Sequence, residues 1–275
     1  MPTPSGDYAA ILAAVGELVA AIERETVARG TVGVASPGAI SKQTGLIKNS
    51  NSTGLNGKPL DKDLARRLGR TIRLENDANC FALSEAVDGA AADARVVFGV
   101  ILGTGVGGGL VVDKAAIAGR NRIAGEWGHN PLPWQREEER PGPPCYCGKQ
   151  GCIETFLSGP ALARQYRDRT GNELTAEAIA LAATRGEPDA LACFAAYRDR
   201  LGRGLATVVD VVDPDAIVLG GGLSNVPQLY DGLPALVERY AFSDAIDTPI
   251  VRAAHGDSSG VRGAAWLWPV GSDGN

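Results

Sequence analysis

The sequence predicts an α/β protein. Short apolar runs, typical of strands, alternate along the chain with longer segments in which apolar residues recur at helical spacing. Glycine-rich stretches at residues 103–109 and 220–222 follow two of the apolar runs, and ligands collect at such turns in α/β folds. With 275 residues, 44% of them hydrophobic, the chain is long enough to bury a sizeable core and to form two lobes.

The first part of the chain reads as helices and short strands. Apolar residues at helical spacing from Tyr8 predict an amphipathic helix to about Arg29. A strand begins at Thr31 and ends at Pro37 and Gly38. The next expected elements are a loop over 50–57, a helix over 61–69, a strand over 71–74, and a helix whose start carries Asn76 and Asp77.

The second part centres on an expected hairpin. A strand over 95–102 runs into the glycine-rich segment 103–109 and then into another apolar run, so bare backbone amides at the turn could approach an anion closely. Further on, the sequence predicts helices over most of 158–212, a buried strand from Ala216, a helix after residues 220–222, and a last helix over 258–268. On the long mid-chain helix, we expect Cys193, Phe194 and Tyr197 in the core, with a subunit interface as the alternative.

Composition and charge exclude several classes of protein. The net charge of −5, the pI near 5.2 and the scattered basic residues argue against a nucleic-acid surface. No apolar run is long enough to span a bilayer. Residues 1–8 lack the basic and apolar segments of a signal peptide, so we expect a cytoplasmic protein that does not bind membranes.

Cysteines cluster in one short segment. Cys145, Cys147 and Cys152 lie within eight residues, and His129, one of only two histidines, lies a short way upstream. Each alone would be read as an ordinary buried residue, but together they form a Cys₃His set, which closes the coordination sphere of a structural zinc ion. The odd total of five cysteines and a reducing compartment disfavour a disulfide. The polar, proline-rich stretch 137–144 between these ligands is expected to be a solvated surface loop.

Several motifs together resemble one family over essentially the whole chain, the bacterial sugar kinases and repressors grouped as ROK (repressor, open reading frame, kinase). They are Pro-Gly at 37–38, Glu-Asn-Asp-Ala-Asn at 75–79, Gly-Thr-Gly-Val-Gly at 103–107, Glu-Trp-Gly-His at 126–129, the cysteine run ending in Glu154, and the glycines at 220–222. Within the family, segments 125–134 and 255–268 most resemble the fructokinase and mannokinase branch. The resemblance implies the two-lobed fold of the actin-like, ribonuclease H-like ATPases.

The resemblance also implies a division of the chain. Residues 1–94 and 258–275 would form the remainder of an N-terminal sugar-binding lobe, and residues 95–257 a C-terminal lobe with the zinc loop and the nucleotide-binding turns. The family's first phosphate-binding turn, Asp-Xaa-Gly-Gly-Thr-Lys, is absent from the sequence together with the strands that carry it. The expected first lobe is therefore truncated.

The implied activity is ATP-dependent phosphorylation of a hexose, with fructose or mannose converted to the 6-phosphate. A glucokinase or an N-acetylglucosamine kinase of the same family is the nearest alternative. A catalytically impaired sugar-binding form is a third reading, because the first phosphate-binding motif is absent. A repressor ranks low, because the first helix leads directly into the first sugar-lobe strand without a basic helix-turn-helix. Relatives are often dimers, so a homodimer is expected.

Asp77 matches the family's catalytic base. Phosphoryl transfer depends mostly on positioning and charge stabilisation, with a carboxylate accepting the proton of the attacking hydroxyl. At the start of a helix, the macrodipole favours the ionised carboxylate that this role needs. Alternatively, an aspartate at this position only caps the helix. The surrounding motifs favour the base.

The resemblance assigns the other ligand contacts residue by residue. Sugar-binding positions are Gly38, Asn51, Asn76, Glu126, His129 and Glu154. Phosphate-side and adenosine-side positions are Gly103, Thr104, Gly105, Gly107, Gly220, Gly221 and Gly222. One imidazole nitrogen of His129 would bind zinc while the other faces the sugar, so the metal would fix the loop that presents Glu126 and Glu154. Mg²⁺ would accompany the nucleotide.

Overall fold

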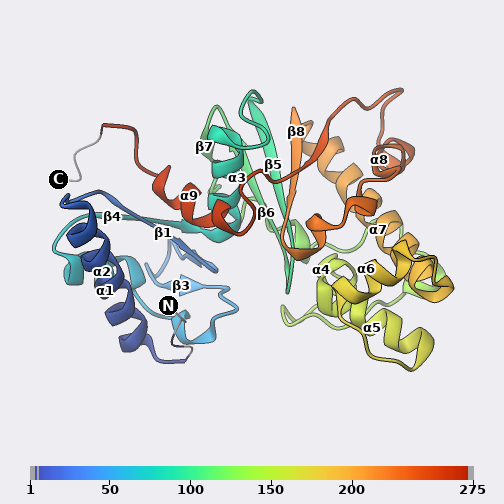
Figure 1. Ribbon diagram of the computed structural model, residues 1–275, viewed down its shortest axis with the longest axis horizontal. Helices are drawn as coiled ribbons and strands as arrows, with labels where there is room; N and C mark the ends of the chain where they lie inside the picture. Colours follow the sequence, from blue (N-terminus) through green and yellow to red (C-terminus); the bar gives the residue numbers. More distant parts are fainter. Residues whose placement is uncertain (1–3, 5, 272–275) are drawn as a thin grey trace.

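Helices and strands alternate along most of the chain, which confirms the predicted α/β class (Figure 1). The computed structural model describes residues 4 and 6–271. The helices are α1 (Tyr8–Thr26), α2 (Leu60–Leu68), α3 (Asp77–Asp88), α4 (Glu154–Leu157), α5 (Gly159–Thr170), α6 (Ala176–Thr184), α7 (Pro188–Val212), α8 (Leu233–Tyr240) and α9 (Ser259–Ala265). Within the described ranges, none of these helices has the length and apolar character needed to cross a membrane.

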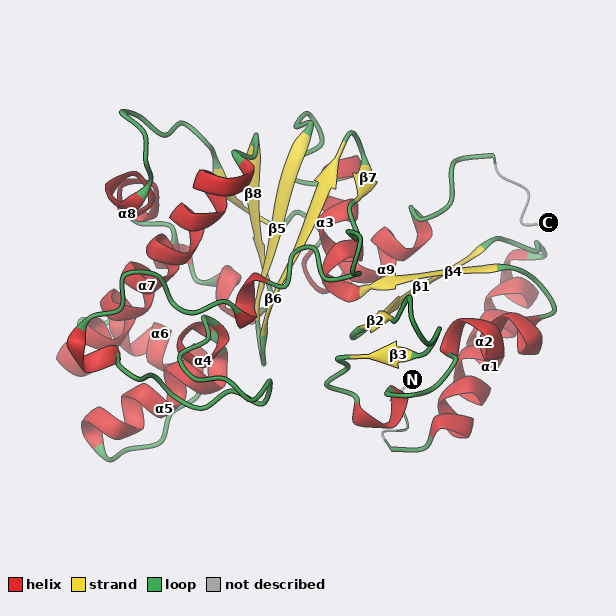
Figure 2. Ribbon diagram, turned by 180° about the vertical axis from the view of Figure 1, so that it is seen from behind, coloured by secondary structure: helices red, strands yellow, loops and turns green. Residues whose placement is uncertain are grey.

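The strands of the described residues belong to three sheets (Figure 2). They are β1 (Val32–Ser36), β2 (Ala39–Ile40), β3 (Ile47–Lys48), β4 (Ile72–Asn76), β5 (Val96–Leu102), β6 (Val106–Val112), β7 (Ala115–Ala116), β8 (Ala216–Gly220) and β9 (Ile250–Arg252). The largest sheet has five strands in the order β7-β6-β5-β8-β9, with β6 antiparallel and β8 parallel to β5. The pairs β1-β4 (parallel) and β2-β3 (antiparallel) form two small sheets near α1 and α2.

The five-stranded sheet is buried on both faces. Successive strand residues point to opposite faces of a sheet. In β5, Phe98 and Val100 accordingly join the core built by helices α5 to α8, whereas Val97 packs with Phe81 of α3 on the other face. On the α7 side, Cys193, Phe194 and Tyr197 are buried, which confirms that they belong to the core.

The N-terminal part of the molecule, which comprises α1, α2 and strands β1 to β4, has a thinner core. Its buried apolar side chains are few: Ala39, Ile47, Leu55, Leu60 and Leu64. Four of the five residues of β1 are only half-buried, and among the described residues its one strand neighbour is β4. This part is small because so few elements cover its sheets.

Helix α9 returns from the C-terminal end and contacts both β1 and α3. Two glycines permit these close approaches: a Cβ on Gly33 would lie 1.7 Å from the Ala264 carbonyl oxygen, and one on Gly263 would lie 1.6 Å from the Cys80 carbonyl oxygen. The indole of Trp268 also donates a hydrogen bond to the Val32 carbonyl at 2.9 Å. α9 therefore ties the N-terminal part to the rest of the molecule.

The predicted boundary between residues 94 and 95 stays a prediction. Helix α3 lies on the N-terminal side of it in sequence, yet it packs against β5 and β6 of the large sheet. The tight contact needs a bare strand, since a Cβ on Gly109 would lie 2.4 Å from the Ala78 carbonyl oxygen. Of the predicted lobes, residues 1–3, 5 and 272–275 lie outside the described part.

Three local expectations differ from the structure. The glycine turn is shorter than 103–109, because β6 begins at Val106 and Gly107 to Gly109 lie within the strand. The segment after residues 220–222 forms a single 3₁₀ turn (Gly222–Asn225) instead of a regular helix. The short strands β2, β3, β7 and β9 were not predicted, since two or three residues carry no periodic signal.

The prediction that 137–144 is a solvated loop is wrong at Glu139. Its side chain is only 3% exposed and receives hydrogen bonds from Arg203 Nη2 and Arg200 Nε, both at 2.7 Å. Arg203, on α7, also donates to the backbone carbonyls of Pro133 and Trp134. The loop is held against α7 because the buried Arg203 needs charged and polar partners, and Glu139 and these carbonyls supply them beside Asp199 of α7 itself.

Candidate active site and zinc loop

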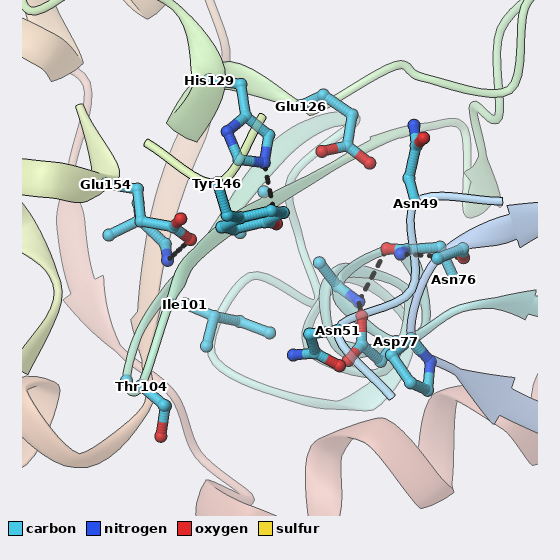
Figure 3. A pocket seen from close by; sticks show the side chains of 18 residues that line it. Asn49, Asn51, Asn76, Asp77, Ile101, Thr104, Glu126, His129, Tyr146 and Glu154 are labelled. Carbon is cyan, nitrogen blue, oxygen red and sulfur yellow. Dashed lines mark hydrogen bonds between the residues drawn. The ribbon is translucent and has the colours of Figure 1, made fainter. Parts of the chain in front are cut away.

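A cavity of about 250 Å³ lies where the end of β4, the glycine turn after β5, and the segment 126–154 meet (Figure 3). We call it the central cavity. Among its lining residues are most of the predicted site: Gly38, Asn51, Asn76, Asp77, Gly103, Thr104, Gly105, Gly107, Glu126, His129 and Glu154. The fold thus brings together side chains that are more than a hundred residues apart in sequence. Gly220, Gly221 and Gly222 lie outside this cavity.

Asp77 is the first residue of α3 but does not cap it. The N-cap is Asn76, whose side-chain oxygen accepts hydrogen bonds from the amides of Ala78 (2.9 Å) and Asn79 (3.3 Å). Asp77 Oδ1 also accepts from the Ala78 amide at 2.9 Å, and among the described residues Oδ2 has no hydrogen-bond donor. The helix is capped without Asp77, so the alternative reading of Asp77 as a simple cap loses its basis.

Burial raises the pKa of Asp77 above its ordinary value, and the hydrogen bond from the Ala78 amide opposes this only in part. The helix terminus was expected to favour the ionised form. Removal of the carboxylate from water outweighs that effect. A raised pKa makes the carboxylate a stronger proton acceptor once it is ionised.

Asn76 and Gly38 form the wall beside Asp77. The side-chain amide of Asn76 donates to the Gly38 carbonyl at 3.2 Å, so its orientation is fixed from both ends. Gly38 has φ of 77°, and a Cβ there would lie 2.4 Å from the Lys48 carbonyl oxygen. Only glycine fits this left-handed turn against the neighbouring strand.

Glu154 links the cysteine run to the glycine turn. Its Oε2 accepts a hydrogen bond from the Val106 amide at 3.0 Å. A Cβ on Gly105 would lie 2.6 Å from the same oxygen, so the bare backbone of the turn is what admits the carboxylate. Glu154 is therefore positioned by the turn that the sequence associates with phosphate.

Glu126 faces the cavity from the opposite side to Asp77 (Figure 3). Burial raises the pKa of Glu126; His129 opposes this shift, and the negative charges of Asp77 and Glu154 add to it. Three carboxylates in one small cavity repel one another, and a ligand rich in hydroxyl donors relieves that repulsion by hydrogen bonding.

The predicted zinc ligands come together. The ligand atoms of His129, Cys145, Cys147 and Cys152 all lie within 4.8 Å of one another. Cys147 Sγ and Cys152 Sγ are 3.7 Å apart, and Cys145 Sγ is 3.5 Å from His129 Nδ1. A tetrahedral zinc ion with Zn–S bonds of about 2.3 Å requires S···S distances of roughly 3.8 Å. The donor set and its spacing therefore fit structural zinc.

His129 uses its two nitrogens differently. Nδ1 faces the sulfur cluster, and Nε2 lies 3.0 Å from the hydroxyl of Tyr146. The two rings meet edge to face with centroids 5.1 Å apart. The second nitrogen thus contacts a tyrosine that itself lines the cavity, a contact that the sequence analysis did not anticipate.

Sequence reasoning missed several lining residues, of which Tyr146 and Asn49 carry polar side chains. Tyr146 could have been found, because a residue between two zinc ligands is fixed wherever the metal loop is fixed. Asn49 gave a weaker signal, since it lies just before a polar loop and only its left-handed backbone (φ 58°) marks it.

Another cavity, of about 410 Å³, lies on the other side of the glycine turn. We call it the third cavity, to distinguish it from the central cavity and from a lateral cavity described below. Gly103 and Thr104 line both the third cavity and the central one, and Gly222 lines the third cavity with them. Gly220 and Gly221 lie behind it: a Cβ on Gly220 would lie 2.4 Å from Phe81, and one on Gly221 2.5 Å from the Leu102 carbonyl oxygen. These two glycines permit close packing.

Comparison with known proteins gives a consistent result. An N-acetyl-D-glucosamine kinase from Erwinia tasmaniensis is 43% identical over 269 residues, covering 96% of this chain and 89% of that protein. One from Vibrio parahaemolyticus is 39% identical over 271 residues, covering 97% and 90%.

Solved structures agree. A ROK hexokinase from Thermus thermophilus superposes with a TM-score of 0.85 at 31% identity, covering 97% of this chain and 88% of that one. A ROK family glucokinase from Streptomyces griseus, in complex with glucose and AMPPNP, gives 0.79 at 28%, covering 97% and 89%. These superpositions confirm the fold that the resemblance implied. The ROK family itself matches residues 1–270, and the chain therefore belongs to the ROK family.

Proposed function

We propose that this ROK-family sugar kinase transfers the γ-phosphoryl group of ATP to the 6-hydroxyl of N-acetylglucosamine. The observation that carries the reaction is the central cavity, where the Asp77 carboxylate shares one small space with Glu126, His129, Glu154 and the glycine turn. The choice of sugar follows the relatives named N-acetyl-D-glucosamine kinase. It replaces the fructose or mannose expected from segments 125–134 and 255–268, which the comparisons do not favour.

The two cavities suggest where the substrates bind. The sugar occupies the central cavity, with its 6-hydroxyl at Asp77 and its other hydroxyls toward Glu126, His129 and Glu154. The nucleotide occupies the third cavity, and its phosphates reach the sugar across Gly103 and Thr104, which border both. Backbone amides of a glycine turn are suitable donors to phosphate oxygens.

Asp77 then acts as the base. Its carboxylate accepts the proton of the 6-hydroxyl, the hydroxyl oxygen attacks the γ-phosphorus, and the bond to the bridging oxygen breaks to release ADP. Mg²⁺ would accompany the nucleotide and would supply neutralising charge. The zinc loop holds His129 and the backbone around Glu126 in place and takes no part in the chemistry.

A sugar-binding form with impaired transfer is a second candidate. β1, which leads to Gly38 in the cavity wall, has a single strand neighbour among the described residues, so this wall is weakly supported. Such a protein would retain the central cavity and bind sugar without turning it over. Homodimer formation and a cytoplasmic location stay predictions.

The test is ADP release by the purified chain with ATP, Mg²⁺ and N-acetylglucosamine, glucose, mannose or fructose. The proposal expects the highest kcat/KM with N-acetylglucosamine. A higher value with fructose would restore the original expectation. Calorimetric binding of N-acetylglucosamine without ADP release would establish the sugar-binding form instead.

A further inference from the structure

A cavity larger than the central one opens beside it. This lateral cavity has a volume of about 840 Å³, against about 250 Å³ for the central cavity. The two share Asn49, Glu126, His129 and Tyr146 as lining residues. The two cavities are therefore neighbours that meet at these four side chains. The proposed reaction uses only the smaller one.

The floor of the lateral cavity is apolar. Trp127, Ile153 and Val208 line it, and each is buried to at least nine-tenths. Gly204 of α7 lies between them, and a Cβ there would come within 2.9 Å of the Trp127 ring, so the space exists partly because α7 has no side chain at this position. One turn further along α7, Val208 and then Val211 continue the same wall.

Chemistry relates this space to the position of the sugar. In a pyranose ring, carbon 2 lies directly across from carbon 5, which carries the hydroxymethyl group. Asp77 lines the central cavity (Figure 3) but not the lateral one, whereas Glu126 and His129 line both. With the 6-hydroxyl at Asp77, the substituent on carbon 2 therefore points toward the side where the lateral cavity opens.

We propose that the lateral cavity receives the N-acyl substituent on carbon 2, and that the chain phosphorylates N-acylglucosamines with acyl chains longer than acetyl. This inference rests on the proposed function. An acetyl group fills roughly 90 Å³ at most, if each water-sized group takes about 30 Å³. The lateral cavity has space for several more methylene groups, and its floor of Trp127, Ile153 and Val208 suits an alkyl chain.

A matched series of sugars tests the inference. ADP release is measured with ATP, Mg²⁺ and glucose, N-acetyl-, N-propanoyl- and N-butanoylglucosamine. We expect kcat/KM for the two longer chains to equal that of the acetyl sugar or to exceed it, by up to about fourfold for each buried methylene. A fall of tenfold or more at the propanoyl sugar, with the acetyl sugar turned over normally, overturns the inference and leaves the proposed function standing.

If no sugar is turned over, calorimetric titration with the same series decides. Binding of the butanoyl sugar at least as tight as that of the acetyl sugar supports the lateral subsite, and tenfold weaker binding overturns it. A chain that binds none of these sugars overturns the inference together with the proposed function.

Two exposed valines provide a matched pair of variants. Val211 lines the lateral cavity and is 78% exposed, whereas Val261 of α9 lies outside the cavities and is 76% exposed. Val211→Trp should lower kcat/KM for the butanoyl sugar at least tenfold relative to glucose, and Val261→Trp should leave that ratio unchanged. Thr207→Phe, one turn nearer the floor on the same face, should lower the ratio further. An equal loss for all sugars in both cavity variants would contradict the subsite.

Discussion

The two ends of the proposed sugar site are held by very different supports. Every residue of β8 in the large sheet is buried, whereas α1, in the N-terminal part, has no buried residue among its 19, all of them described. Leu18 and Ile22 of α1 are each half exposed. The glycine turn and segment 126–154 belong to the part built around the five-stranded sheet, which we call the dense part. Gly38 and Asn51 belong to the N-terminal part, which we call the thin part.

This contrast implies unequal local stability. Segments with few buried apolar contacts open with lower free energy than core strands. The wall formed by Gly38 and Asn51 should therefore fluctuate more than the wall formed by Glu126 and Glu154. Binding of a sugar between the two walls would order the thin side, whereas the dense side would keep the conformation that it has without sugar.

Asp77 lies where the thin and dense parts meet, on helix α3, which packs against the five-stranded sheet. Its loss should lower activity more than any other change proposed here. Asp77→Asn removes the proton acceptor while it preserves shape, so kcat should fall by about 10²–10⁴-fold. Sugar affinity, measured by calorimetry, should change little. Asp113→Asn is the control: Asp113 is exposed, pairs with Arg95 and has a φ of 50° that asparagine tolerates, so activity should persist.

The acid limb of the rate profile offers a second test of the same residue. Only the ionised carboxylate accepts a proton, and burial raises the pKa of Asp77. As pH falls through this raised value, kcat should decline at a higher pH than an ordinary aspartate would produce. Glu126 also has a pKa raised by burial, so the profile is repeated with Glu126→Gln. If the acid limb disappears in that variant, the titrating group is Glu126 and not Asp77.

The Arg203–Glu139 pair should dominate the stability of the dense part. Arg203→Met leaves the buried Glu139 with Arg200 as its remaining arginine partner, and breaking a buried pair costs about 3–5 kcal/mol. The free energy of unfolding, from urea titration, measures this loss. Glu139→Gln combined with Arg203→Met should cost less than the sum of the two single losses, because the interaction between the two side chains is lost only once. Additive losses would show that the pairing contributes nothing.

Glu139 also predicts a pH dependence. Hydrogen bonds from Arg203 and Arg200 outweigh the effect of burial and lower the pKa of Glu139 from 4.5 to about 2. The unfolded chain therefore binds the proton at a higher pH than the folded one. The stability from this group is complete above about pH 4.5 and is lost as pH falls toward 2. The drop in melting temperature over this window should be smaller in Glu139→Gln.

A leucine pair compares the two cores directly. Leu219 of β8 is fully buried and Leu74 of β4 is half-buried. Truncation to alanine should cost about 3 kcal/mol at Leu219 and about 1 kcal/mol at Leu74, since the cavity left by a half-exposed side chain is open to water. Equal losses by urea titration would mean that the thin part is packed as well as the dense part.

Removal of zinc should act on the sugar side of the dense part alone. Cys145→Ser lowers zinc occupancy and frees His129, which should weaken N-acetylglucosamine binding by about 10–100-fold. ADP binding should remain, because the third cavity does not include the zinc ligands. Cys193→Ala, which removes a buried thiol outside the cluster, is the control. Unchanged sugar affinity in Cys145→Ser would separate the metal from the site.

Much of the fold followed from local patterns, and what was missed depends on distant contacts. The spacing of apolar residues predicts helices such as α1 and α2. The two-residue strands β2 and β7 form only because neighbouring strands pair with them. The burial of Glu139 is decided by Arg203, 64 residues away, and no local signal in a run of glutamates indicates it.

The candidate site was predicted mainly through motifs. Asp77, Glu126 and Glu154 lie in short runs whose composition is unusual, and the fold brings them together. Tyr146 was not predicted, because the predicted zinc ligands Cys145 and Cys147 beside it account for this segment without a role for the tyrosine. The size of the lateral cavity depends on the missing side chain at Gly204 and on packing of α7 against Trp127, which the sequence alone does not reveal.

A crystal structure of the chain with N-acetylglucosamine and ADP tests the central claim most directly. The account predicts the 6-hydroxyl oxygen within about 3.2 Å of the Asp77 carboxylate, with the carbon 2 substituent on the side of Glu126 and His129. A sugar bound in the central cavity with its 6-hydroxyl toward Glu126, and with no contact to Asp77, would contradict it.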